Sequence, residues 1–192
     1  CCFSSRTDAG VHAIGQVVNF KTLSKLDDDY KVIHQLNGIL PEDMAVVKLS
    51  EVAEDFHARF NAKSREYLYK IFIRRQRPVL RLDSLAWVKE DLDFERMQEH
   101  AQSFLGAHDF ARYCYKAGEL PEGKSTMCTV EVSELIKESK ICFKYRIKAN
   151  RFLRHMVRNI VGELIEIGKG NPAPEKQSPA PAEGLTLVSV NY

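Results

Sequence analysis

The segment from 141 to 167 constrains the fold of this chain more than any other part of its sequence. Between 141 and 149 the residues alternate as they do in a half-buried β-strand. The apolar members share one face: Ile141, Phe143, Tyr145 and Ile147. The other members share the opposite, cationic face: Cys142, Lys144, Arg146 and Lys148. From 152 to 167, apolar residues recur at helical spacing and form one continuous stripe. A strand and a helix with one apolar face each predict an α/β fold in which helices cover a sheet.

Shorter patterns extend this prediction to the rest of the chain. Strands are expected at 16–20, 45–49, 66–73, 129–135 and 185–190, and the polar residues 137–140 predict a hairpin turn. Amphipathic helices are expected at 29–40 and 94–105. This order suits two α/β halves that share one sheet, residues 1–75 and residues 76–192. The second half carries the basic helix at 152–167 and a linker or exposed loop at 171–183, whose composition offers little to bury.

Composition excludes several classes of protein. With 192 residues, of which 44% are hydrophobic, the chain can bury a sizeable core. Its formal net charge is only +2, so a nucleic-acid partner would need local clusters of basic residues. No apolar run approaches the roughly 18 residues that span a bilayer, and no signal peptide opens the chain, so an intracellular protein is expected. The first residue is Cys1 and not Met, which suggests that natural N-terminal sequence, with any targeting peptide, is missing.

The cysteines and histidines do not predict a metal site. The five cysteines form no Cys-x-x-Cys pair, and the six histidines lack the spacing of zinc ligands. We therefore expect free thiols and no bound metal.

The octapeptide 6–13, Arg-Thr-Asp-Ala-Gly-Val-His-Ala, holds the strongest candidate for a catalytic group. Asp8 lies between Arg6 and the permissive Gly10, directly before a strand-like segment. A turn there can hold the carboxylate in a cleft, and Arg6 would favour its ionised form if the two side chains converge. The alternative is an Asx-turn, in which Asp8 only caps backbone amides.

A basic ridge is expected on the helix at 152–167, on the side opposite its apolar stripe. The basic residues that lie there are Arg151, Arg154, His155 and Arg158, and Gly162 joins them. Charge runs of this kind are usually solvated helix faces. This ridge contains no acid, arginine suits bidentate phosphate contacts, and a glycine lets a backbone or a ligand approach closely.

Four segments, in order, resemble the motifs of the TruA-type tRNA pseudouridine synthases. Residues 6–13 resemble the catalytic loop of that family. Residues 55–60 (Asp-Phe-His-Ala-Arg-Phe) and 64–69 (Ser-Arg-Glu-Tyr-Leu-Tyr) resemble its second motif. Residues 149–162 (Ala-Asn-Arg-Phe-Leu-Arg-His-Met-Val-Arg-Asn-Ile-Val-Gly) resemble its third, and residues 182–185 (Ala-Glu-Gly-Leu) resemble its C-terminal motif. The resemblance implies an α+β type of fold, in which two pseudo-symmetric halves share a mixed, mostly antiparallel sheet flanked by helices, with an RNA cleft between them.

The same resemblance implies an enzyme that isomerises uridine to pseudouridine in tRNA, usually at positions 38 to 40 of the anticodon stem and loop. It implies no cofactor, and it makes a homodimer possible. Asp8 matches the nucleophile of the family, and Arg158 matches the arginine that keeps this carboxylate ionised and oriented. Tyr67 matches the tyrosine that stacks on the flipped base. The alternative for Tyr67 is an aromatic residue of the strand core.

The remaining site residues follow from the resemblance and from the basic clusters. Leu185 matches an apolar residue of the base pocket, and Arg6 and Arg59 are expected near the site or the adjacent phosphates. Contacts to the RNA backbone are expected from the basic residues of the cleft: Arg59, Lys144, Arg146, Lys148, Arg151 and Arg154.

Three departures from the family pattern keep other functions open. The family normally carries a first strand with a Gly-x-x-Phe-x-Gly-x-Gln type of segment, which has no counterpart before Cys1. Ser5 stands where many members have glycine, and the stretch between 170 and 182 is shorter than usual and lacks the expected helix. The main alternative is therefore a non-catalytic RNA-binding protein or RNA chaperone of the same fold. A metal-dependent hydrolase built on Asp8 and the histidines would require divalent ions.

Overall fold

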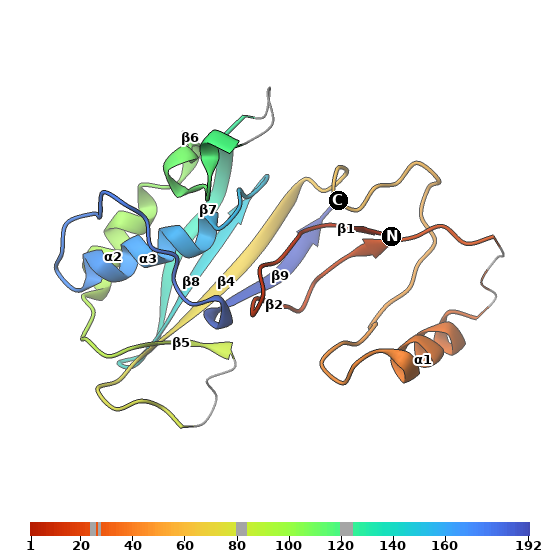
Figure 1. Cartoon of the computed structure of the whole chain (residues 1–192), viewed down its shortest axis with the longest axis horizontal. Helices are drawn as coiled ribbons and strands as arrows, with labels where there is room; N and C mark the ends of the chain where they lie inside the picture. The colour runs from red at the N-terminus through yellow and green to blue at the C-terminus, as the bar shows by residue number, and fades with distance from the viewer. Residues whose placement is uncertain (24–25, 27, 80–83, 120–124) are drawn as a thin grey trace.

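Strands whose apolar and polar residues alternate form a mixed sheet at the centre of the molecule (Figure 1). The computed structural model describes residues 1–23, 26, 28–79, 84–119 and 125–192. Within these residues the strand order is β2-β9-β4-β8-β7-β6, and β5 pairs with β4. The strands are β2 (His12–Ala13), β4 (Ser64–Ile73), β5 (Ala86–Val88), β6 (Gly106–Asp109), β7 (Met127–Ser139), β8 (Cys142–Ala149) and β9 (Leu185–Asn191). In this sheet β2–β9 and β4–β5 are parallel pairs and the other pairs are antiparallel, so the mixed, mostly antiparallel sheet is confirmed.

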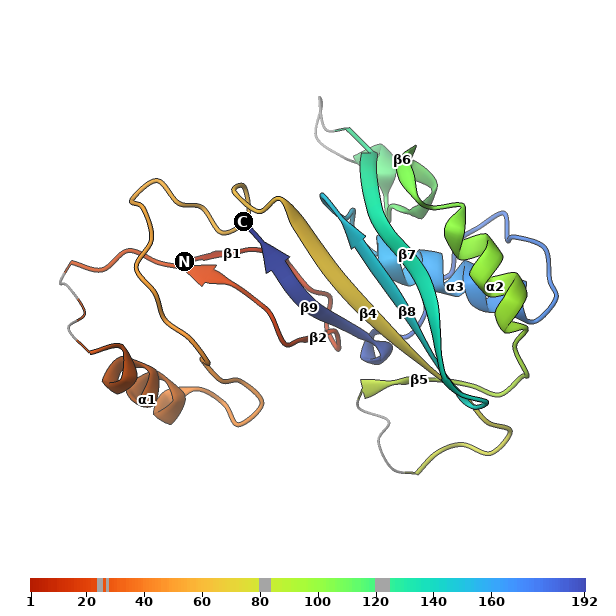
Figure 2. The ribbon, with the colours of Figure 1, turned by 180° about the vertical axis from the view of Figure 1, so that it is seen from behind.

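Two helices cover one face of this sheet. The helices α2 (Phe94–Gln102) and α3 (Met156–Gly168) lie side by side on the same side of the strands, as the opposite views in Figures 1 and 2 show. The apolar faces of strands and helices meet there and bury Tyr69, Ile71, Tyr145, Ile147, Met97, Ile160 and Leu164. Burial of such surface is the main favourable contribution to folding, which explains why these elements were predictable. Strands overlapping 66–73, 129–135, 141–149 and 185–190 are confirmed, and β7 continues to Ser139, so the hairpin turn is tighter than predicted.

The helix α3 begins four residues later than the sequence predicts, at Met156 and not at 152. His155 precedes it with a left-handed backbone, φ 61°, which interrupts the helical path. Arg151 and Arg154 therefore lie on the turn before the helix, and Arg158 lies in its first turn. The predicted ridge is thus divided between a loop and a helix, although its members remain close in space.

The N-terminal segments form a smaller, more open part of the molecule (Figure 1). Strands β1 (Cys2–Phe3) and β3 (Val18–Asn19) pair antiparallel, so the strand predicted at 16–20 is shorter than expected. The predicted helix at 29–40 is confirmed as α1 (Asp29–Ile39), but none of its residues is buried. The strand predicted at 45–49 is wrong. Residues 45–49 pair with none of the described strands, and the backbone of Val46 instead bonds to the side chain of Asn37.

Two smaller expectations concern the cysteines and membrane spans. The five cysteines are free, as predicted. Among the described residues, no helix combines the length and the apolar character that crossing a membrane requires.

The segment predicted as an exposed loop at 171–183 is in fact anchored to α3 in its second part. Its first residues are mostly exposed, but Ala180 and Ala182 are buried, and η4 (Ala182–Gly184) leads directly into β9. Gly162 explains the close contact, because a side chain there would meet the Ser178 carbonyl oxygen. The expected close approach at Gly162 is therefore made by backbone of the same chain.

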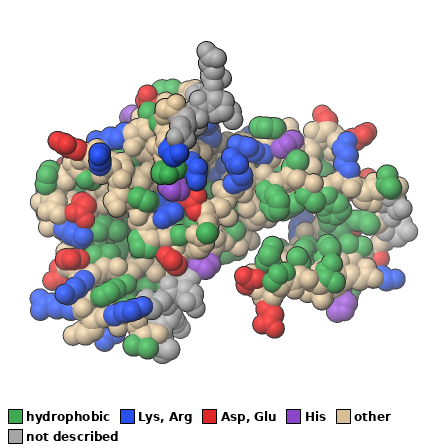
Figure 3. Space-filling view, in the orientation of Figure 1, with side chains coloured by type: hydrophobic (Ala, Val, Ile, Leu, Met, Phe, Trp, Pro, Cys, Tyr) green, Lys and Arg blue, Asp and Glu red, His purple; other side chains and the backbone are tan. Residues whose placement is uncertain are grey.

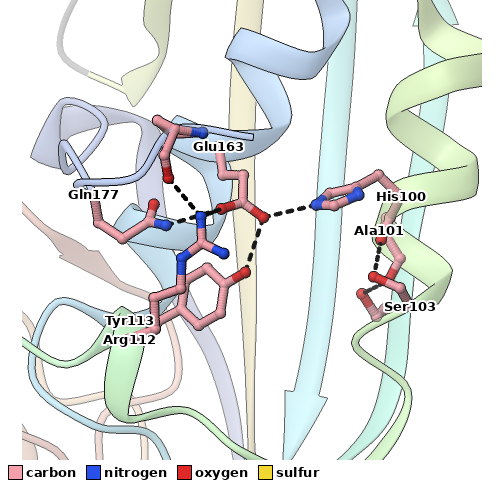
Figure 4. Close-up of polar contacts among 9 residues, drawn as sticks. His100, Ala101, Ser103, Arg112, Tyr113, Glu163 and Gln177 are labelled. Atoms are coloured by element: carbon pink, nitrogen blue, oxygen red, sulfur yellow. Dashed lines mark hydrogen bonds and ion pairs between the residues drawn. The ribbon is translucent and has the colours of Figure 1, made fainter. Parts of the chain in front are cut away.

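A buried carboxylate ties this segment to the helices (Figure 4). Only 1% of the Glu163 side chain is exposed, and each of its oxygens has two partners. Oε1 lies 2.7 Å from His100 Nε2 and accepts a hydrogen bond of 2.8 Å from the Tyr113 hydroxyl. Oε2 accepts from Arg112 at 3.1 Å and from Gln177 at 2.8 Å. Burial opposes ionisation of Glu163, but these donors outweigh it and lower its pKa below the ordinary value of 4.5.

Candidate active site

A pocket of about 730 Å³ lies where segments distant in the sequence come together on the helix-covered side of the sheet. It is lined by residues from the loop after β1, from the start of β4, from the turn before α3 together with its first turn, and by Leu185 at the start of β9. These segments include parts of all four motifs that the sequence singled out. The sequence-predicted residues that line it are Arg6, Asp8, Arg59, Tyr67, Arg151, Arg154, Arg158 and Leu185.

The loop that carries Asp8 is fixed at both ends. Before it, the Ser4 amide donates to the Val17 carbonyl, and the Gln16 side chain bonds to the backbone of Ser5. After it, β2 pairs in parallel with β9, so the loop is tied to the central sheet. Gly10 turns the chain with φ 83°, a conformation that glycine adopts without strain. The sequence therefore folds into a tight turn that holds Asp8 beside β9 and α3.

Asp8 is held by two side chains at the N-terminal end of α3. Its Oδ2 accepts a hydrogen bond of 2.9 Å from Arg158 Nη1 and lies 3.4 Å from His155 Nε2. Only 27% of its side chain is exposed. None of the described backbone amides donates to this carboxylate, so the Asx-turn alternative is not what is observed. The partner of Asp8 is Arg158, distant in sequence, and not Arg6.

Arg158 is oriented from its other side by the segment before β9. Its Nε donates to the Ala180 carbonyl at 2.8 Å, and the Ala180 amide donates back to the Arg158 carbonyl at 3.0 Å. The guanidinium therefore cannot rotate freely, and one of its terminal nitrogens points at the carboxylate. A charged donor held in this way makes a charge-assisted hydrogen bond that fixes the orientation of the Asp8 carboxylate.

Tyr67 and Leu185 form the apolar floor of the pocket. Both are buried, and the Tyr67 ring makes an edge contact with Phe152 at a centroid distance of 5.0 Å. Burial raises the pKa of the Tyr67 hydroxyl, so it remains a neutral phenol at neutral pH. Tyr67 belongs to the buried core and also lines the pocket, so its place in the strand core is confirmed and its contact with a base stays a prediction.

Arg65 is a site residue that sequence reasoning missed. It is buried, and its guanidinium donates to the carbonyl oxygens of Ser4, Arg59, Ala62 and Asn150. Three of the loops that line the pocket are thereby joined at one side chain. The sequence did contain a sign of this position: Arg65 lies two residues before Tyr67, so the two side chains share one face of the strand.

His155 was placed on the basic ridge, but its contact with Asp8 was not foreseen. Burial lowers the pKa of His155, although the Asp8 charge beside it acts in the opposite direction. A neutral imidazole is therefore expected beside Asp8 at neutral pH. The left-handed backbone that places this ring has no signal in the sequence, because non-glycine residues rarely adopt it.

The lining of the pocket is strongly cationic. Six arginines line it, and Asp8 is the one carboxylate among the lining residues. The arginines are Arg6, Arg59, Arg65, Arg151, Arg154 and Arg158. Figure 3 shows Lys and Arg side chains gathered in the middle of this face of the molecule. A surface of this kind attracts phosphate groups and would position an RNA backbone.

Three predicted contributors lie elsewhere, which corrects the expectation that they share the cleft of Asp8. Lys144, Arg146 and Lys148 are on the face of β8 opposite the helices and do not line the pocket. Each is paired with acids of neighbouring strands or of the hairpin: Lys144 with Glu138, Arg146 with Glu66 and Glu134, and Lys148 with Glu131. A single strand does not reveal its cross-strand neighbours, so these ion pairs were invisible in the pattern.

The described residues contain no group of three or more His, Cys, Asp or Glu side chains arranged to hold a metal ion. The histidine beside Asp8 belongs instead to the arginine-rich rim. The chemistry that this arrangement supports is nucleophilic attack by an oriented carboxylate in a pocket that attracts phosphate.

Comparison with known proteins identifies what the chain is similar to. A family model described as "tRNA pseudouridine synthase" matches residues 100–180. "tRNA pseudouridine synthase A" of Enterobacter sp. (strain 638) is 40% identical over 205 residues, which cover 100% of this chain and 74% of the relative. The protein of the same name from Geobacillus kaustophilus is 38% identical, and the match covers 98% of this chain and 76% of the relative. The protein of that name from Acetivibrio thermocellus is 39% identical, and the match covers 98% of this chain and 81% of the relative.

Proposed function

Because the chain belongs to the TruA family of tRNA pseudouridine synthases, we propose that its pocket isomerises uridine to pseudouridine in tRNA. The observation that supports this most directly is the pairing of Asp8 with Arg158 inside an arginine-lined pocket. No cofactor enters the proposal, because the reaction only rearranges atoms already present in the substrate.

The reaction requires one bond to break and another to form on the same nucleotide. Asp8 attacks the target nucleoside, and the bond between N1 of the base and C1′ of the ribose breaks. The base then turns and rejoins the ribose through C5, and the bond that Asp8 formed to the nucleoside breaks, which regenerates the carboxylate. In the same steps C5 loses a proton and N1 gains one. Arg158 holds the Asp8 carboxylate in a fixed orientation by its hydrogen bond.

The apolar floor suits a base that has left the helical stack. The reacting atoms of a stacked uridine are inaccessible, so the target nucleotide must be flipped into the pocket. Tyr67 would stack on the flipped base, with Leu185 adding apolar contact, and the neutral Tyr67 hydroxyl could take part in proton transfer.

Arginines around the pocket would hold the RNA backbone. We assign this role to Arg6, Arg59, Arg151 and Arg154, which line the pocket and have no carboxylate partner among the described residues. They position the RNA without reading its sequence, so binding weakens as salt concentration rises. The proposed target is the anticodon stem and loop, at positions 38 to 40, as the family resemblance implies.

The arrangement of the whole molecule is proposed on the same basis. Residues 1–75 supply Asp8 and Tyr67, and residues 76–192 supply Arg158 and Leu185, which supports two halves with the RNA between them. A homodimer that grips one tRNA is proposed from the family resemblance, and sedimentation of the protein with and without tRNA tests it. Because tRNA is the substrate, the protein is proposed to act inside the cell.

The proposed function is tested by mapping pseudouridine in unmodified tRNA transcripts after incubation with the protein and a metal chelator. Carbodiimide labelling followed by primer extension locates each pseudouridine. Product in the anticodon arm is the expected result. Tight, salt-sensitive tRNA binding by a folded protein without any product would instead support a non-catalytic RNA-binding protein.

Substitution of Arg158 is expected to lower the rate more than the affinity. In the Arg158→Gln variant, Asp8 loses its charged partner, and we expect kcat to fall about 100-fold with a much smaller change in KM. Arg158→Lys should recover part of this loss, because it restores the charge but not the planar fork. The matched control is Arg77→Gln, at an exposed arginine outside the pocket. A rise in KM with unchanged kcat would show that Arg158 only binds RNA.

A further inference from the structure

An exposed tyrosine lies at the rim of the pocket and belongs to none of the motifs described above. The Tyr115 ring has the Arg154 guanidinium over it, 4.7 Å from its centroid. The imidazole of His155 lies against the same ring, at a centroid distance of 4.8 Å and an angle of 33°. The Tyr115 amide also donates to the Arg154 carbonyl at 2.9 Å, so the two segments are joined through their backbones. Nevertheless 43% of Tyr115 remains exposed.

The backbone around this ring is strained on both sides. Among the described residues, the two that are not glycine and have positive φ are Lys116, with φ 56°, and His155, with φ 61°. Lys116 follows Tyr115 directly and places its Nζ 5.9 Å from the ring centroid. His155 contacts the ring from the other segment. Strained residues of this kind persist where the surrounding structure holds them, and they concentrate at functional sites.

The ring lies close to the reacting carboxylate. His155 contacts Tyr115 with its ring and approaches Asp8 Oδ2 with Nε2 at 3.4 Å, so one side chain separates the tyrosine from Asp8. Arg154 and His155 both line the pocket, whereas Tyr115 lies just outside it. A group bound on Tyr115 would therefore be a neighbour of the group bound at Asp8.

The chemistry of the cluster matches an unstacked nucleic-acid base. When one nucleotide is flipped out of an RNA loop, the bases next to it lose a stacking partner. Aromatic rings and arginine guanidinium planes both offer a flat replacement surface, which accepts any base because every base has a π-face. A guanidinium stacked on a tyrosine also places positive charge where the adjacent phosphate would lie.

We propose that Tyr115 and Arg154 form a stacking subsite for a base directly next to the target uridine. This inference rests on the proposed function, since it takes the flipped uridine to lie at Asp8. Tyr115 thereby acts in substrate binding, and it holds the flanking nucleotide while the target base turns in the pocket.

The test uses an anticodon stem-loop RNA with 2-aminopurine placed immediately 5′ or immediately 3′ of the target uridine. The emission of 2-aminopurine is quenched when it stacks on a neighbour. Binding is measured in the Asp8→Asn background, so that no turnover alters the RNA. Tyr115→Phe keeps the ring, Tyr115→Leu keeps only apolar bulk, and Tyr115→Ala removes both. Tyr30→Ala is the matched control, because Tyr30 is an exposed tyrosine on α1 that does not line the pocket.

We expect quenching at one of the two positions with Tyr115 and with Tyr115→Phe, and loss of that quenching with Tyr115→Leu and Tyr115→Ala. The dissociation constant should rise roughly tenfold when the ring is removed. Tyr30→Ala should change neither quantity. Thermal unfolding of each variant verifies that the protein stays folded.

The subsite is overturned if the emission at both positions is the same with Tyr115→Ala as with Tyr115→Phe. It is equally overturned if Tyr115→Ala, in a protein with native Asp8, slows turnover without changing the emission, because the ring would then only position His155. The proposed function is judged separately, by product formation on the unmodified stem-loop with the native protein. Quenching without any product would contradict the proposed function and leave the subsite standing.

Discussion

Replacement of Asp8 by asparagine is expected to abolish pseudouridine formation while tRNA binding changes by only a few fold. Asparagine has nearly the shape of aspartate, so the turn at 8–11 and its packing should survive the change. It carries no charge and is not a nucleophile, so the first step of the proposed reaction is lost. Removal of a nucleophile typically costs roughly 10⁴-fold or more in rate. Six arginines still line the pocket, so the attraction for RNA remains.

The measurement is single-turnover conversion of a tRNA transcript at saturating enzyme, with filter binding of the same transcript in parallel. Asp91→Asn serves as the matched control, because Asp91 is exposed and lies outside the pocket. Turnover by the Asp8→Asn protein at more than about a hundredth of the normal rate would show that another group is the nucleophile.

The second large effect is expected on stability, from loss of the Glu163 carboxylate. The carboxylate of Glu163 is almost fully buried, and Glu163→Ala removes it. Four side chains then lose their shared hydrogen-bond partner: His100, Arg112, Tyr113 and Gln177. Breaking one side of a buried polar network leaves uncompensated groups, so we expect the free energy of unfolding to fall by about 2–4 kcal/mol. Urea unfolding followed by circular dichroism measures this change.

The neighbouring Glu166 provides the matched control for Glu163. It lies on the same helix and pairs with Lys169, but it is partly exposed. Because exposed ion pairs contribute little, Glu166→Ala should lower the free energy of unfolding by less than about 1 kcal/mol. Equal losses in the two variants would mean that the Glu163 network adds nothing beyond the helix itself.

The depressed pKa of Glu163 also predicts a dependence of stability on pH. A carboxyl group whose pKa is lower in the folded state stabilises the fold above its ordinary pKa of 4.5. That contribution disappears as the pH falls from 4.5 through the folded-state pKa. The native protein should therefore lose stability more steeply below pH 4.5 than Glu163→Gln does. Parallel urea titrations at neutral and acidic pH test the difference, and identical slopes would contradict it.

Local pattern predicted the central elements well because burial acts on one face of each element. In the strand β4 every second side chain points inward, which places Tyr67 and Tyr69 in the core. In the helix α3 the apolar residues recur at the helical period, which places Ile160 and Leu164 in the core. The strand expected at 45–49 shows the limit of this reasoning. Apolar residues can suggest a strand, but a strand also needs a partner strand for its backbone, and residues 45–49 pair with none of the described strands.

The candidate site was partly predictable for the same reason. Asp8, Tyr67 and Arg158 were singled out from motif residues, and the fold gathers them in one pocket. Lys144, Arg146 and Lys148 were assigned to that pocket because the sequence shows their charge but not their acidic partners on β4 and β7. The contacts of Arg65 with four backbone carbonyls likewise depend on loops that no local pattern places.

The sequence by itself determined which residues are buried in the main strands and helices, and which segment carries the carboxylate proposed as the nucleophile. It determined these because side-chain periodicity and turn chemistry are properties of neighbouring residues. The family resemblance implied that Arg158 pairs with Asp8, and the structure shows this contact. Only the tertiary structure decided that His155 also approaches Asp8, and that Tyr115 lies against His155 and Arg154. These contacts arise when packing brings distant segments together, and such proximity leaves no periodic trace in the chain.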